Sequence, residues 1–189
     1  MPSLLQRTTC LLTCLCVLGL VGCAGDRSVE RPWLGSVRHE LGHLGARNWV
    51  VVAEAAFPTP SHRGLRVIQV DADIPDVLEG LEEVIEEKHH VKPRIYLTRE
   101  IDQVPYDYAP GVKAHRADLK DALHGRETVK LDNALLLSLI NSTTKNYRVL
   151  VIKTRTALPY SSVFVELGSG YWDAHSEAAL RKEMEEKFE

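Results

Sequence analysis

The chain has 189 residues, which suits one domain of ordinary size with terminal extensions and excludes a large multidomain enzyme. Hydrophobic residues make up 44% and charged residues 26%, values typical of soluble globular proteins, so extensive disorder and a polytopic membrane protein are both disfavoured. With 23 Lys and Arg against 26 Asp and Glu, the formal net charge is −3. No basic surplus is available to neutralise a phosphate backbone, and nucleic acid is therefore a poor candidate partner.

The N-terminal segment has the features of a bacterial lipoprotein signal peptide. Arg7 precedes a mostly apolar run over residues 10–21 that is too short to span a bilayer comfortably. The run ends in Leu20-Val21-Gly22-Cys23, which resembles a lipobox, so residues 1–22 are predicted to be removed and Cys23 to be diacylated. The alternative is an ordinary signal peptide or a short anchor with a chance cysteine.

The position of the cysteines constrains the remainder of the chain. All four lie within the first 23 residues, so neither a disulfide framework nor a Cys-rich zinc site is expected after Cys23. Residues 23–32 are short and polar and are interpreted as a tether between lipid and domain. Acyl chains on Cys23 would hold the protein on a membrane surface in the cell envelope, and Ala24 favours the periplasmic face of the outer membrane. The choice between inner and outer membrane stays open.

The domain is predicted to span residues 33–168, with strands and helices in alternation. Apolar residues at helical spacing predict a short helix from Leu34 to about Leu44, and a β-branched apolar run at residues 49–53 predicts a buried strand that Glu54 closes. The later expected strands are 65–70, 94–97, 128–131, 148–152 and 163–167, and the later expected helices are 74–85, 119–123 and 132–144, the last with Asp132 as its cap.

This alternation predicts a single α/β layered domain with a largely parallel sheet. Residues 169–189 are helix-prone and highly charged, with few apolar positions. They are interpreted as a C-terminal helical extension that packs on the domain, packs on a neighbouring subunit, or frays.

Several segments in this order resemble the ribose pyranase / fucose mutarotase family. The resemblance begins with Leu41-Gly42-His43, continues with the apolar strand that ends in Glu54 and with Phe57-Pro58, and ends with Pro159-Tyr160-Ser161-Ser162. It covers residues 34–168 and implies the fold of that family.

The resemblance implies a cofactor-free isomerase that interconverts the anomers or ring forms of a free monosaccharide. His43 would move a proton, as an imidazole that titrates near neutral pH can, and Glu54 would orient it or accept a sugar hydroxyl. Tyr160 and Ser162 would bind the sugar. The resemblance also implies a homo-oligomer, because family members form rings in which neighbouring subunits complete each site.

Other interpretations of these residues remain open. His43 could simply cap the carbonyls of a helix end, and Glu54 could be a strand-end carboxylate in solvent. Ser162 stands where the family has Asn, and Ser138, Ser142 and Thr156 stand where it has further site residues. A second hypothesis is therefore a noncatalytic sugar-binding or assembly lipoprotein with a degenerate site. Neither hypothesis identifies the sugar or the number of subunits.

The remaining histidines do not indicate a metal site. His89 and His90 are adjacent and cannot both face one metal from a regular helix, while His62, His115 and His124 are scattered among predicted loops. No metal and no cofactor are predicted.

Overall fold

We describe residues 31–188 in a computed structural model of the protein. The predicted signal peptide, the predicted lipidation site Cys23 and most of the predicted tether lie outside the described residues. Among the described helices, none combines the length and the apolar character needed to cross a membrane.

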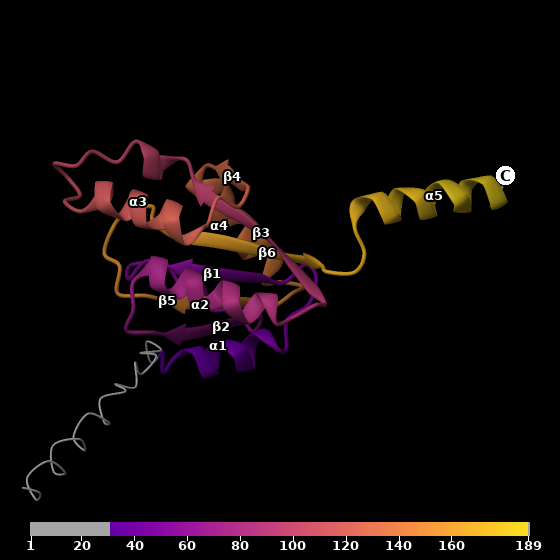
Figure 1. The fold of residues 1–189 in the computed structure, drawn as a ribbon, viewed down its shortest axis with the longest axis horizontal. Helices are drawn as coiled ribbons and strands as arrows, with labels where there is room; N and C mark the ends of the chain where they lie inside the picture. The colour runs from indigo at the N-terminus through magenta and orange to yellow at the C-terminus, as the bar shows by residue number, and fades with distance from the viewer. Residues whose placement is uncertain (1–30, 189) are drawn as a thin grey trace, which may run out of the picture. The chain divides into compact units, whose positions relative to one another are not determined.

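The centre of the protein is a six-stranded sheet in the order β2-β5-β1-β6-β3-β4 (Figure 1). Five strands run in one direction and β6 runs in the other, because β6 pairs antiparallel with both β1 and β3 while the other pairings are parallel. The α/β fold with a largely parallel sheet is therefore confirmed. The strands are β1 (Trp49–Ala53), β2 (Leu65–Gln69), β3 (Val91–Thr98), β4 (Thr128–Leu131), β5 (Val149–Lys153) and β6 (Val163–Ser169).

The central strand β1 is buried along its whole length. At its midpoint, Val51 pairs with Val151 of β5 on one side and with Phe164 of β6 on the other. A strand covered on both faces and both edges requires a continuous apolar run, and Trp49-Val50-Val51-Val52-Ala53 supplies it.

Helices cover the two faces of the sheet unequally. Alternate side chains of β1 enter two separate cores: Val50 and Val52 pack against α1, α2 and α3, whereas Val51 packs on the face that α4 covers with Leu136 and Ile140. The helices are α1 (Leu34–Leu41), α2 (Ile74–Glu86), α3 (Val112–Ala122), α4 (Asn133–Thr143) and α5 (Ala174–Phe188), with a short 3₁₀ turn at Glu100–Asp102.

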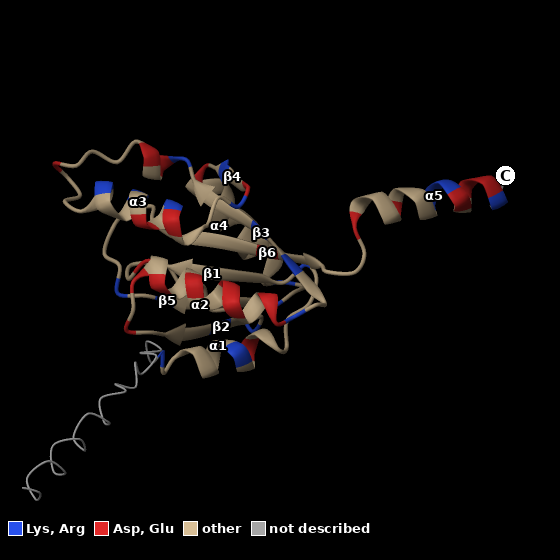
Figure 2. Ribbon diagram, viewed as in Figure 1, with Lys and Arg blue, Asp and Glu red and all other residues tan. Residues whose placement is uncertain are grey.

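Helix α2 confirms the clearest helix predicted from sequence. Its apolar stripe is buried, and its acidic residues lie on another face, where Figure 2 shows them in red. Part of that face binds the chain before and within α1: Arg31 pairs with Glu83 at 2.6 Å, and Arg38 pairs with Glu87 at 2.8 Å. Another part binds Arg126, which pairs with Glu82 at 2.8 Å and with Glu86 at 2.7 Å, so much of the face that the sequence predicted to be solvated is ion-paired.

Three elements differ from the sequence predictions. Strand β3 begins at Val91 and α3 begins at Val112, so both are longer than expected. Asp132 does occupy the N-cap position of α4, but its side chain makes no capping hydrogen bond and pairs with Arg99 instead. The Glu100 carboxylate accepts the hydrogen bonds from the Asn133 amide, a long-range cap that local spacing cannot indicate.

The C-terminal extension forms the predicted helix, α5. Its side chains are largely exposed, including those of Leu180 and Met184. Spaced charge pairs within the helix, such as Arg181 with Glu177 at 2.7 Å, support it locally.

Candidate functional site

The carboxyl ends of the five codirectional strands meet at one edge of the sheet, which we call the carboxyl edge. Glu54 follows β1, Arg99 follows β3 and Asp132 follows β4. The Pro159-Tyr160-Ser161-Ser162 turn enters the same edge, because β6 runs in the opposite direction and begins there. In open α/β sheets this edge is the usual place for a ligand.

Glu54 and the predicted sugar-binding turn are in direct contact. The Ser161 amide and the Ser162 hydroxyl each donate a hydrogen bond to Glu54 Oε2 at 3.1 Å, and the Glu54 amide donates to Ser162 Oγ at 3.1 Å. Both serines are buried, and Glu54 is half-buried. One oxygen of the Glu54 carboxylate therefore holds the turn in place.

The turn presents Tyr160 in an uncommon backbone conformation. Tyr160 has a φ of 60°, in the left-handed region that a bulky L-residue rarely adopts. Its carbonyl accepts a 2.6 Å hydrogen bond from the buried hydroxyl of Thr98, at the end of β3. Hydrogen bonds to Thr98, at the end of β3, and to Glu54, after β1, thus hold the turn in place. Tyr160 itself stays 41% exposed.

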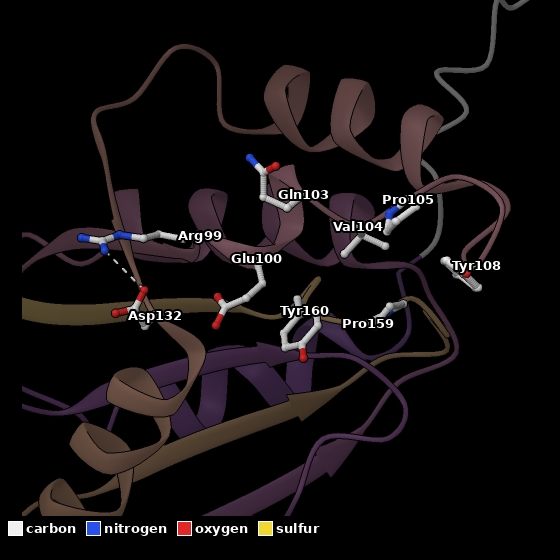
Figure 3. Close-up of a pocket in the computed structure, with 9 residues that line it drawn as sticks. All are labelled: Arg99, Glu100, Gln103, Val104, Pro105, Tyr108, Asp132, Pro159 and Tyr160. Carbon is white, nitrogen blue, oxygen red and sulfur yellow. Dashed lines mark hydrogen bonds and ion pairs between the residues drawn. The ribbon is translucent and has the colours of Figure 1, made fainter.

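The Tyr160 ring lines a cavity of about 500 Å³ (Figure 3). Its wall is mostly apolar, with Val104, Pro105 and Pro159, and the exposed Tyr108 ring lies at its rim. Small-molecule sites commonly join an apolar and aromatic wall to a few fixed polar groups. This cavity has the required wall.

Three charged residues, Arg99, Glu100 and Asp132, give the cavity its polar side. The Glu100 carboxylate accepts two hydrogen bonds from the Asn133 amide, at 2.9 and 3.1 Å, which fixes its position. Arg99 pairs with Asp132 at 3.3 Å, as Figure 3 shows. Such groups offer acceptors and donors to a ligand that carries hydroxyls. Sequence reasoning did not select Arg99 or Glu100, although their position directly after a predicted strand was a signal that could have found them.

His43 lies at the other edge of the sheet. It follows α1 and precedes the beginning of β1, whereas Glu54 follows the end of β1, so the two residues flank opposite ends of the same strand. The His43 ring packs edge-on against His39, with ring centroids 5.1 Å apart. Within one chain, Glu54 contacts Ser162 in the turn that carries Tyr160, and His43 lies apart from them. Of these four residues, only Tyr160 lines the cavity.

Thr156, one of the departures from the family pattern, has a structural role. Its hydroxyl accepts a 3.0 Å hydrogen bond from the Ile74 amide, at the beginning of α2. Arg155 pairs with Asp73 at 3.0 Å beside it, and hydrogen bonding from Arg155 lowers the pKa of Asp73. These contacts connect the end of β5 to α2.

The histidine His115 of α3 is buried, and the charges of Asp118 and Asp73 act on it. Desolvation lowers its pKa, and its Nε2 has no hydrogen-bond partner among the described residues. Within residues 31–188, no group of three or more His, Cys, Asp or Glu side chains is placed to hold a metal ion.

Comparison with known proteins identifies solved structures of similar fold. No model of a known protein family and no curated protein sequence matches the chain. RbsD of Bacillus subtilis, complexed with D-ribose, is 20% identical over 70% of this chain and 91% of its own, with a TM-score of 0.48. The fucose mutarotase of Streptococcus pneumoniae, in complex with L-fucose, is 15% identical over 75% of this chain and 94% of its own, with a TM-score of 0.47.

A third structure is described as a putative sugar binding protein. It is 14% identical over 76% of this chain and 97% of its own, with a TM-score of 0.50. That similarity shows a shared fold. The structure neighbours belong to the ribose pyranase / fucose mutarotase family, which is the family that the sequence motifs resemble.

Proposed function

We propose that the protein binds a free monosaccharide in the carboxyl-edge cavity. The observation that carries the proposal is the Tyr160 ring, on a turn that hydrogen bonds hold in place, beside the anchored Glu100 carboxylate in one cavity. A sugar presents C–H groups that pack on an aromatic ring and hydroxyls that need donors and acceptors. A cavity of about 500 Å³ lies within the range of roughly 300–1,000 Å³ typical of small-molecule sites.

Binding can be tested by saturation-transfer NMR and calorimetry on the full-length protein. The first sugars to test are D-ribose and L-fucose, which two of the compared structures contain. Tyr160→Ala should weaken binding by about tenfold or more, because it removes the aromatic wall. Tyr171→Ala is the matched control, since Tyr171 is 80% exposed and does not line the cavity. Absence of binding to a panel of common free monosaccharides, or equal binding by the Tyr160 variant, would contradict the proposal.

The finer proposal is an isomerase of the mutarotase or pyranase type that needs two copies of the chain. Glu54, Tyr160 and Ser162 would act from one copy, and His43 of a second copy would transfer the proton. Support comes from the fixed geometry around Glu54 and from the outer surface of α4, where Leu135 is 47% exposed and could contact another subunit. Exchange NMR should detect anomer interconversion above the spontaneous rate, and His43→Ala should lower it by about 100-fold.

The alternative is a noncatalytic sugar-binding or assembly protein. It is favoured by the separation of His43 and Glu54 at opposite ends of β1 and by the structural role of Thr156. In that case sugar binding persists while the protein adds nothing to the spontaneous exchange rate, with or without His43. The same exchange measurement therefore separates the two functions.

We also propose that a lipid on Cys23 anchors the protein in the cell envelope. The support is the Leu20-Val21-Gly22-Cys23 motif after a short apolar run. Mass spectrometry of the protein from bacterial membranes should find an N-terminal diacylglyceryl-modified Cys23, and Cys23→Ser should release the protein from the membrane fraction. An N-terminus elsewhere would contradict the anchor.

A further inference from the structure

A second concave surface lies at the opposite, amino edge of the sheet. It encloses about 630 Å³ between the chain that leads into β2 and the turn between α4 and β5. His43 and Asn48, from the chain between α1 and β1, complete its lining. We call it the amino-edge pocket.

Backbone contacts fix the two loops that form this pocket. The Val149 amide donates a 2.9 Å hydrogen bond to the Gly64 carbonyl. A Cβ on Gly64 would lie 2.5 Å from the Thr144 carbonyl oxygen, so only glycine allows the loops to approach this closely. Asn48 adds a side-chain link, because its Oδ1 accepts a 2.8 Å hydrogen bond from the Arg148 amide. The side chains on the rim therefore project from a defined base.

The charges in the pocket all have one sign. Arg63, Lys145 and Arg148 line it, and its lining contains no Asp or Glu. None of these three cations forms an ion pair with any residue between 31 and 188. The formal charge of the whole chain is −3, so the three cations of this pocket oppose the sign of the net charge. Like charges gathered without counter-ions repel, and a bound anion would relieve that repulsion.

We propose that the amino-edge pocket binds the phosphate group of a small ligand. Two guanidinium groups can each donate paired N–H groups to phosphate oxygens, and Lys145 adds a point charge. The imidazoles of His43 and His62, which also line the pocket, supply further donors. The argument uses only the amino edge and does not depend on sugar binding at the carboxyl edge.

The test is calorimetric titration of the full-length protein with inorganic phosphate at low ionic strength. We expect saturable binding that weakens as salt is added, since exposed cations are screened. Arg63→Gln and Arg148→Gln should each weaken phosphate binding by about tenfold, and the double variant should abolish it. Arg181→Gln removes the same charge from α5, outside the pocket, and should leave phosphate binding unchanged.

Two other results would overturn the proposal. One is no phosphate binding at millimolar concentration, or binding that the double variant retains. The other is Arg63- and Arg148-dependent binding to phosphatidylglycerol vesicles without binding of free phosphate, which would identify a lipid-headgroup surface instead. Unchanged D-ribose or L-fucose binding by the double variant separates this site from the carboxyl-edge cavity. A failure of sugar binding with phosphate binding intact would leave the present inference standing.

Discussion

At the scale of single residues, the contacts of Glu54 distinguish a structural carboxylate from a solvent-facing one. It lies half-buried between two buried serines and accepts hydrogen bonds from the Ser161 amide and the Ser162 hydroxyl. The sequence left both possibilities open, because a strand-end acid can turn toward water or toward a neighbouring loop. The partners come from a segment more than a hundred residues away, which no local pattern reveals.

Glu54→Ala should lower the free energy of unfolding by roughly 1–3 kcal/mol, because it leaves buried donors of Ser161 and Ser162 without an acceptor. Urea denaturation measures the loss. Glu54→Gln should lose less, since its amide oxygen can still accept a hydrogen bond. Glu185→Ala, on the exposed surface of α5, is the control and should change stability by only a few tenths of a kcal/mol. Equal stability of the Glu54→Ala variant and the wild type would show that these contacts do not hold the turn.

At the scale of elements, the close approach of β2 to the α4–β5 turn depends on Gly64. A Cβ at this position would lie 2.5 Å from the Thr144 oxygen and 2.8 Å from the Tyr147 oxygen, and both are backbone atoms that cannot rotate away. Gly64→Ala should therefore destabilise the protein by about 1–3 kcal/mol in thermal or urea denaturation.

Gly35 provides the matched control for Gly64. It lies on the exposed side of α1, and an added Cβ would have no atom within 4 Å. Gly35→Ala should stabilise the protein by roughly 0.5–1 kcal/mol, because alanine loses less backbone entropy in a helix. If both variants shift the free energy of unfolding in the same direction, the close backbone approach at Gly64 does not explain the effect of Gly64→Ala.

The ion pair between Arg155 and Asp73 connects the end of β5 to the beginning of α2 and makes stability depend on pH. Hydrogen bonding from Arg155 lowers the pKa of Asp73 in the folded protein. Because the pKa of Asp73 is lower in the folded protein than in the unfolded chain, where it is about 3.9, the ionised carboxylate stabilises the fold above about pH 3.9. This contribution is lost as the pH falls through the lower pKa of the folded protein.

Arg155→Gln should therefore be less stable than the wild type near neutral pH, and the loss should be small because the pair is about half exposed. The difference should shrink as pH falls below about 3.9 and vanish below the lowered pKa of Asp73 in the folded protein. Urea midpoints at about pH 7, 5, 3 and 2 measure it. Lys120→Gln, an exposed cation of α3, is the control. A difference that persists unchanged in acid would contradict the link to Asp73.

At the scale of the whole molecule, periodicity predicted the elements well and their assembly less well. The run Trp49-Val50-Val51-Val52-Ala53 predicted a buried strand, and the boundaries of β1 match it. The antiparallel course of β6 could not be predicted, because strand direction is decided by pairing between distant segments. Of the candidate site, the structure places Glu54 and Ser162 in contact beside Tyr160 and places His43 at the opposite edge, and the roles of all four stay predictions.

That separation permits a decisive experiment on whether two copies build one catalytic site. If catalysis needs His43 of one copy and Glu54 of another, the His43→Ala and Glu54→Gln variants should each be inactive in anomer exchange. Unfolding and refolding them together in equal amounts should restore activity, because roughly one quarter of the sites would then join an intact His43 to an intact Glu54.

Two controls follow from the way in which the subunits mix. Mixing the two variants without refolding should restore little activity if the assembled subunits do not exchange. Refolding either variant alone should restore none, because every site in it lacks the same group. Analytical ultracentrifugation of the wild type should find an oligomer, as any site shared between copies requires. A monomer, or a refolded mixture as inactive as its components, would exclude the shared site and leave noncatalytic binding as the function of the carboxyl edge, because one chain keeps His43 and Glu54 at opposite ends of β1.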